Sequence, residues 1–230
     1  MTRLIVFDCD GTLVDSQHLI AAAMVETFAT VGLAAPSTEV VRRVVGLRLD
    51  EAIARLLPDS LIGQAEALSE TYKTAFHRLR ADPAMPQDPL FPAARETLRA
   101  LAEAGYLLGI ATGKSRRGLR LTLERHGLAG LFVTLQTAND APGKPDPAMV
   151  RQAMEEAGAA PHETLVIGDT VFDMKMAANA GVRALGVAWG YHEPAELIEA
   201  GALGLVERFD ELPARLGALR AAGAGGGNGS

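Results

Sequence analysis

The sequence predicts an α/β fold in which a doubly wound, mostly parallel sheet carries an all-helical insertion after its first strand. The short apolar run at 4–7 is followed by about seventy residues of helical periodicity without a strand-like run. From residue 93 onward, helical segments alternate with short apolar runs, which is the pattern of βαβ units. These observations indicate one sheet-forming domain interrupted by helices.

The strands of the sheet are expected where apolar runs end in small or acidic residues. After the first run at 4–7, they are expected at 107–111, 131–135, 164–168 and 184–188. Helices are expected between them at 93–104, 116–126, 147–157 and 171–180. Several of these helices are followed by glycine, which readily adopts the left-handed conformation that closes a helix.

The insertion is expected to hold four helices, at 16–31, 37–45, 49–57 and 60–80. The return segment 81–92 carries four prolines, which is typical of a stiff linker between domains. We therefore expect a core domain formed by residues 1–15 and 84–220 and a helical domain formed by 16–83. The Gly- and Ala-rich segment 221–230 is expected to be disordered.

Composition excludes several classes of partner. The chain of 230 residues has a formal net charge of -6 and no dense basic tract, which argues against nucleic acids and anionic membranes. The single cysteine, Cys9, cannot form an intramolecular disulfide, and no long apolar stretch or signal-peptide pattern is present. We expect a cytoplasmic protein.

Polar residues follow the predicted strands at their carboxyl ends, where ligands of open α/β sheets bind. Asp8 and Asp10 follow the first strand, Thr112 follows the second, and Asp169 follows the strand at 164–168. Lys144 lies in a Gly-Lys-Pro loop after the strand at 131–135. These residues are expected to converge.

The acids of this set predict a metal site. Asp8 and Asp10 could simply form a turn with Gly11, but Asp169 and Asp173 add two acids to the same crevice. Four carboxylates brought together need a compensating cation, and three oxygens from such acids plus water suit octahedral Mg²⁺.

The remaining groups can bind an anion. The Thr112 hydroxyl and the backbone N–H groups that follow it, beginning at Gly113, precede a helix, although an ordinary capped turn has the same sequence. Lys144 could direct its ammonium at a phosphate and offset the acids, or it could be a solvated surface lysine. Together with the metal, these groups are those needed to transfer a phosphoryl group to an aspartate.

Four ordered motifs make the chain resemble a known family. Residues 8–16, 111–114, 143–147 and 168–173 read DCDGTLVDS, ATGK, GKPDP and GDTVFD. They resemble the motifs of the haloacid dehalogenase-like hydrolases, over about residues 1 to 215. The branch most similar is that of the phosphoglycolate phosphatases, which includes the Gly-Tyr-His at 190–192.

The resemblance implies a Rossmann-like core, a helical cap and a role for each acid. Asp8 would be the nucleophile and Asp10 the general acid/base. Asp8, the backbone carbonyl of Asp10, and Asp169 would hold Mg²⁺, with Asp173 supporting them. Arg48, at a helix start in the cap, is a candidate ligand for a substrate carboxylate.

The resemblance also narrows the activity. Metal-independent dehalogenases and phosphonatases lack an acid at the position of Asp10, so hydrolysis of a small phosphorylated metabolite is expected, with 2-phosphoglycolate the first substrate to test. The alternatives are pyrophosphate hydrolysis, a sugar-phosphate phosphatase or mutase, and a non-catalytic protein that binds a phospholigand. A monomer or homodimer is expected. In this family the return linker often reads Phe-Pro-Gly, whereas here Ala93 follows Pro92.

Overall fold

The computed structural model of the protein describes residues 2–86 and 88–224. Its centre is a six-stranded sheet in which all neighbouring strands are parallel. The strand order is β3-β2-β1-β4-β5-β6. The strands are β1 (Leu4–Phe7), β2 (Leu107–Thr112), β3 (Thr134–Thr137), β4 (Thr164–Gly168), β5 (Arg183–Val187) and β6 (Leu205–Val206). The predicted α/β class and parallel sheet are confirmed.

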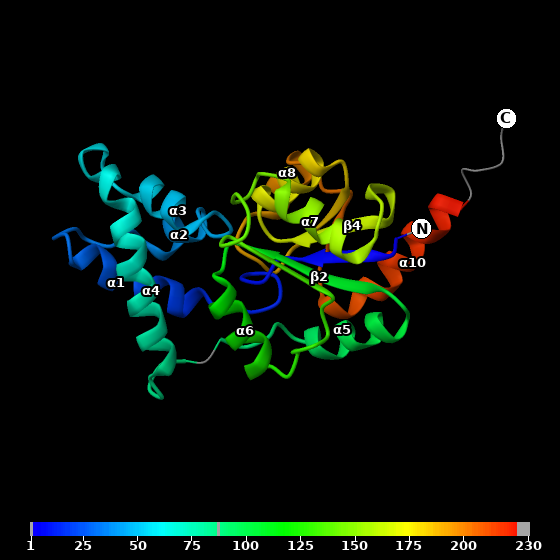
Figure 1. Cartoon of the computed structure of the whole chain (residues 1–230), viewed down its shortest axis with the longest axis horizontal. Helices are drawn as coiled ribbons and strands as arrows, with labels where there is room; N and C mark the ends of the chain where they lie inside the picture. Colours follow the sequence, from blue (N-terminus) through cyan, green and yellow to red (C-terminus); the bar gives the residue numbers. More distant parts are fainter. Residues whose placement is uncertain (1, 87, 225–230) are drawn as a thin grey trace.

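Helices cover both faces of the sheet, as Figure 1 shows. On one face pack α5 (Ala94–Glu103), α6 (Arg116–Arg125) and α10 (Leu212–Ala224). On the other face pack α7 (Ala148–Ala157), α8 (Val171–Ala180) and α9 (Pro194–Glu199). The sheet is therefore doubly wound, which explains why its strands read as continuous apolar runs.

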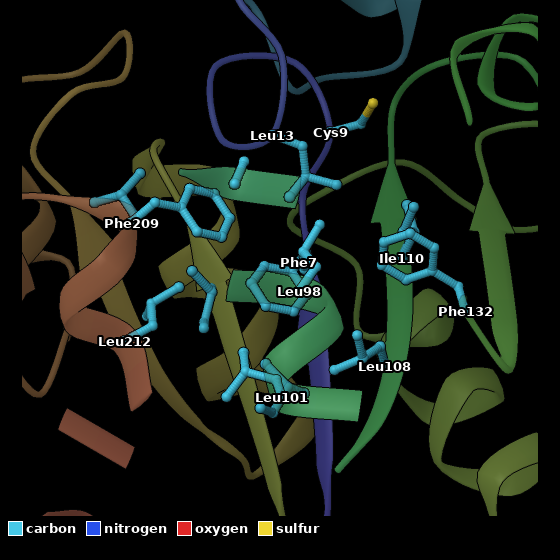
Figure 2. Close-up of a cluster of buried hydrophobic side chains, with 14 of the residues drawn as sticks. Phe7, Cys9, Leu13, Leu98, Leu101, Leu108, Ile110, Phe132, Phe209 and Leu212 are labelled. Atoms are coloured by element: carbon cyan, nitrogen blue, oxygen red, sulfur yellow. The ribbon is translucent and has the colours of Figure 1, made fainter. Parts of the chain in front are cut away.

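Strand β1 contributes side chains to the hydrophobic clusters on both faces of the sheet. Ile5 and Phe7 belong to the cluster on the α5 and α10 face, whereas Leu4 and Val6 belong to the opposite cluster. In Figure 2, Phe7 lies among side chains such as Leu98 of α5. Successive side chains of a strand point to opposite faces, so β1 is buried on both sides. This fixes the position of the residues that follow Phe7.

The insertion between β1 and β2 is helical and lies beside the sheet domain in Figure 1. It contains α1 (Gln17–Ala29), α2 (Thr38–Arg42), α3 (Leu49–Leu56), a 3₁₀ helix (Asp59–Gln64) and α4 (Ala65–Ala81). These helices share a hydrophobic cluster of their own, which includes Met24, Phe28, Ile53 and Phe76.

The chain leaves and re-enters the sheet domain along neighbouring paths. The N–H of Asp15 donates to the carbonyl of Pro89 at 2.9 Å, and the N–H of Phe91 donates to the carbonyl of Leu13 at 3.0 Å. The two connections to the insertion are therefore tied together at its base.

Three expectations about elements were wrong in detail. The strand expected at 131–135 begins only at Thr134, because Phe132 packs into the core from a loop rather than from a ladder. An apolar run indicates that its residues are buried, but buried residues need not be paired in a strand. The helix expected at 37–45 ends at Arg42, and the one expected at 60–80 begins as a 3₁₀ helix and becomes α-helical only at Ala65.

The end of the chain also differs from expectation. Helix α10 extends to Ala224, four residues into the segment 221–230 that was expected to be disordered. Alanine has the highest helix propensity, so its abundance in this segment supports continuation of the helix. Residues 225–230 lie outside the described part of the chain. Helix α9 and the two-residue strand β6 were not predicted from the sequence.

Within residues 2–86 and 88–224, no helix combines the length and apolar character needed to cross a membrane.

Candidate active site

The site lies at the carboxyl end of β1, which is flanked by β2 and β4. The connection that follows β1 runs to one face of the sheet, and the connection that follows β4 runs to the other face. Ligands of open α/β sheets bind at the carboxyl ends of two such neighbouring strands. The end of β2 brings Thr112 to this end of the sheet, and the loops that follow other strands bring Asp8, Lys144 and Asp169 there. All four residues are buried.

Three carboxylates form a tight cluster. Oxygen atoms of Asp8, Asp169 and Asp173 all lie within 4.8 Å of one another. Burial, opposed by Lys144 and reinforced by the charge of Asp173, raises the pKa of Asp8 to about 7. Burial and the neighbouring Asp8 also raise the pKa of Asp169 well above its usual range. In the absence of a further cation, the site therefore favours protonated carboxyl groups.

Lys144 is the cation inside this cluster. Its Nζ lies 2.7 Å from Oδ1 of Asp8 and 2.6 Å from Oδ1 of Asp173, and its side chain is fully buried. Burial alone would lower the pKa of Lys144, but the charges of Asp173 and Asp8 outweigh it and raise the pKa. Lys144 is therefore an ammonium that bridges two acids, and the alternative of a solvated surface lysine is wrong.

Neighbouring donors orient the other two carboxylates. The Thr12 hydroxyl donates to Oδ1 of Asp169 at 2.8 Å, and the N–H of Tyr191 donates to Oδ2 of Asp169 at 2.9 Å. The Thr170 hydroxyl donates to Oδ2 of Asp173 at 2.6 Å. The roles of Thr12 and Thr170 were missed from sequence. Thr170 could have been found, because Thr followed three residues later by an acid is a capping-box pattern at a helix start.

The donor set fits a hard divalent cation. Lys144 offsets one of three clustered carboxylates, and Oδ2 of Asp8 is buried without a hydrogen-bond partner among the described residues. Carboxylate oxygens are the protein ligands that Mg²⁺ prefers, and a bound cation favours their ionised form. The cluster therefore has both the chemistry and the unused ligand capacity for Mg²⁺.

The side chain of Asp10 lies outside this cluster. Its Oδ1 is 2.8 Å from Nζ of Lys114, and it accepts a hydrogen bond from the Ser16 hydroxyl. The Asp10 carboxylate thus lies in the same crevice as Asp8 but is not one of the clustered acids. The ion pair between Lys114 and Asp10 was not predicted, because the position of Lys114 in the sequence does not show which acid it contacts.

The two residues expected to bind phosphate after β2 lie beside the insertion. Thr112 is the last residue of β2, and its hydroxyl accepts from the N–H of Lys114 at 3.2 Å. A Cβ at Gly113 would come within 2.6 Å of the carbonyl oxygen of Leu47, so only glycine allows this approach. The loop between α2 and α3 therefore packs directly on the site.

Arg48 stands in the same loop, but its guanidinium is engaged. Its Nε donates to Oδ1 of Asp50 at 2.9 Å, and 46% of its side chain is exposed. A role in binding a substrate carboxylate would require exchange of this partner.

A cavity of about 370 Å³ opens between the two parts of the chain. Asp8, Asp10, Thr112 and Gly113 line it from the sheet side, and residues of α1 to α4 line it from the insertion. Asp8, alone of the three clustered acids, thus borders a space large enough for an organic ligand.

Comparisons with known proteins agree with this geometry. The sequence model of the haloacid dehalogenase-like hydrolase family matches residues 5–187. A protein of Dickeya dadantii (strain 3937) named "Probable phosphatase IndB" is 32% identical over 216 residues, which cover 92% of each chain. A phosphoglycolate phosphatase of Vibrio vulnificus (strain YJ016) is 34% identical over 202 residues, covering 83% of this chain and 85% of the relative.

A solved structure is similar over nearly the whole chain. The crystal structure of a hydrolase from Pseudomonas syringae superposes with a TM-score of 0.81 at 30% sequence identity. The match covers 95% of this chain and 99% of the other, so it includes both the sheet and the helical insertion.

Proposed function

Given that this chain belongs to the haloacid dehalogenase-like hydrolases, we propose that it is a Mg²⁺-dependent phosphatase that acts through an aspartyl-phosphate intermediate. Relatives that match more than four-fifths of the chain are named as phosphatases, so the enzyme is a phosphatase of this family. Its substrate would be a small phosphate monoester. The observation that carries the proposal is the buried cluster of Asp8, Asp169 and Asp173 around Lys144, open to a cavity beside Asp8.

The proposed first step is nucleophilic attack by Asp8. A carboxylate oxygen of Asp8 forms a bond to phosphorus while the bond from phosphorus to the alcohol oxygen breaks. Asp10 gives its proton to the departing alkoxide. The ammonium of Lys144, 2.7 Å from Asp8, is close enough to offset negative charge on the phosphate oxygens.

The second step returns the enzyme to its starting state. Water attacks the phosphorus of the acyl phosphate, and Asp10, now ionised, takes the proton of that water. The bond from phosphorus to Asp8 breaks, and inorganic phosphate leaves. Lys114 and Ser16 hold the carboxylate of Asp10 at the cavity wall, apart from the metal-binding acids, where it can serve in both steps.

The metal would be held by Asp8, the backbone carbonyl of Asp10, and Asp169, with Asp173 supporting, and it would supply positive charge to the phosphate oxygens. Thr112 and Gly113 would hold the phosphate from the β2 side.

We assign residues 1–15 and 84–220 to a catalytic core and 16–83 to a cap. The separate hydrophobic cluster of α1 to α4 and the paired connections at residues 13–15 and 89–91 support this division. A cap that closes over the cavity would exclude water from the aspartyl phosphate except for the attacking molecule.

Phosphate release separates this proposal from its alternatives. Wild-type protein with Mg²⁺ should release phosphate from 4-nitrophenyl phosphate, and a panel that includes pyrophosphate and sugar phosphates should rank the natural classes by kcat/KM. The non-catalytic binding protein predicts no release from any of them.

Asp8→Asn tests the nucleophile. The variant should lose at least about a thousandfold in kcat, because the amide cannot attack phosphorus. The matched control, Asp210→Asn, removes an exposed acid remote from the cavity and should keep full activity. Near-wild-type turnover by Asp8→Asn would reject the assignment.

A further inference from the structure

The part of the cavity formed by the cap combines buried apolar side chains with more exposed charged ones such as Arg48 and Glu70. Met24, Val44, Leu47, Tyr72 and Phe76 line it, and each is at least nine-tenths buried. The rings of Tyr72 and Phe76 stack at a centroid distance of 5.8 Å. A ligand that reaches from Asp8 into this space therefore meets the exposed part of these hydrocarbon and aromatic side chains, beside the charged ones.

The cavity is also larger than a two-carbon alcohol needs. Its volume of about 370 Å³ lies within the range of roughly 300 to 1,000 Å³ that is typical of sites for drug-sized ligands. A phosphate that sits beside Asp8 with a two-carbon group attached leaves the remaining exposed surface of the apolar wall in contact with water. A bulkier alcohol would bury that wall and gain its transfer free energy.

No lysine or arginine that lines the cavity in the described part of the chain lacks an acidic partner. Three such cations pair with three acids, namely Lys114 with Asp10 at 2.8 Å, Lys73 with Glu70 at 2.6 Å, and Arg48 with Asp50 at 2.9 Å. His77 also lines the cavity, and burial lowers its pKa, which favours the neutral imidazole. Glu66 adds a further acid to the lining.

From these contacts we infer that the substrate is the phosphate monoester of an uncharged alcohol with an apolar body, such as an aryl or branched-chain group. A carboxylate in the same place would leave water for apolar side chains, and to gain a cation it would have to exchange with the acid of an exposed ion pair, a modest cost. A neutral body pays neither cost. The inference rests on the proposed phosphatase activity and names its substrate class.

Matched esters test the charge of the alcohol. With wild-type protein and Mg²⁺, kcat/KM should be at least about tenfold higher for the amide of 2-phosphoglycolate than for 2-phosphoglycolate itself. The two differ mainly in one carboxylate. Equal or faster hydrolysis of 2-phosphoglycolate would overturn the inference and would favour Arg48 as a carboxylate ligand, while leaving the phosphatase proposal intact.

A second pair of esters tests the apolar wall. Benzyl phosphate should have a kcat/KM at least about tenfold above that of methyl phosphate, because its ring buries apolar surface that the methyl group cannot reach. A flat ranking of these two esters would overturn the inference. Absence of phosphate release from all four esters would instead reject the phosphatase proposal.

A variant that fills part of the cavity tests where the alcohol part of the substrate binds. Ala52, buried on α3, lines the cavity, whereas Ala67 is exposed on α4 and does not. Ala52→Leu should lower kcat/KM for benzyl phosphate about tenfold and change methyl phosphate by less than about twofold. Ala67→Leu adds the same volume outside the cavity and should change neither. Equal losses for both esters in a folded Ala52→Leu variant, checked by thermal melting, would contradict the placement; the wild-type comparisons stand without it.

Discussion

The Nζ of Lys144 lies 2.7 Å from Oδ1 of Asp8, and both side chains are buried at the end of β1. The same ammonium contacts Asp173 on α8, so a loop after β3 is tied to β1 and to the helix that follows β4. The positive charge of Lys144 therefore links these elements by ion pairs and offsets the negative charge of the buried acids.

Lys144→Met should destabilise the metal-free protein by about 3 to 5 kcal/mol, because it leaves buried acids without their cation. Urea unfolding with EDTA measures this change. The exposed Lys175 on α8 provides the control, since Lys175→Met removes the same charge from the surface and should cost less than about 0.5 kcal/mol. Equal stability of the two variants would show that the buried bridge contributes nothing.

The stability of the metal-free protein should decrease as the pH rises. Burial raises the pKa of Asp8 to about 7 from 3.8, so the folded protein keeps a proton that the unfolded chain loses. The stabilisation is full below 3.8 and is lost as the pH passes about 7. Tm in EDTA should therefore fall between about pH 5 and about pH 8, whereas saturating Mg²⁺ should raise Tm more at the higher pH, because it binds the ionised acids.

Two variants control this measurement. Asp8→Asn removes one titrating carboxyl and should weaken the dependence of Tm on pH without abolishing it, because the pKa of the buried Asp169 is also raised. The exposed Asp210→Asn should leave the dependence unchanged. A Tm in EDTA that rises from pH 5 to pH 8 would contradict the expected sign.

Arg80 should anchor the cap to the core. Its guanidinium donates to the Thr122 hydroxyl of α6 at 2.9 Å and lies 3.7 Å from Asp88, with both charged side chains buried. Arg80→Met should cost about 3 to 5 kcal/mol, since it leaves Asp88 unpaired. Adding Asp88→Asn should recover part of that loss in a double-mutant cycle.

Arg78 is the matched control for Arg80. It lies two residues away on α4, is exposed, and pairs with Glu26 at the surface. Arg78→Met should cost at most about 1 kcal/mol. Similar costs for the two substitutions would show that burial of Arg80 has no energetic consequence.

Ala93→Gly should stabilise the protein by about 0.5 to 1 kcal/mol. Ala93 has a φ of 62°, the left-handed region, where a Cβ costs about 1 to 2 kcal/mol. Part of that gain is offset by the greater freedom of glycine in the unfolded chain. Chemical denaturation measures the change, and Ala104→Gly, at a φ of -76°, should be destabilising instead. A loss of stability in Ala93→Gly would mean that the left-handed conformation carries no strain.

Much of the fold could be predicted from local pattern. The strand at 164–168 and the helix at 171–180 have the expected bounds, because apolar periodicity and capping residues act over a few positions. Strand β3 was misplaced because the burial of Phe132 in a loop has the same signature as a strand. Strand β6 has two residues and is formed only by pairing with β5, which no local pattern reveals.

The sequence by itself determined which chemical groups follow the strands and, through the order of its motifs, the family to which the chain belongs. Tertiary structure decided which of those groups contact one another. Lys144 bridges Asp8 and Asp173, whereas the Asp10 carboxylate pairs with Lys114 outside that cluster. Tertiary structure also decided that cap residues line a cavity beside Asp8. The physical reason is that ion pairing and burial depend on distances between segments far apart in the chain, whereas sequence patterns report only local periodicity and turn chemistry.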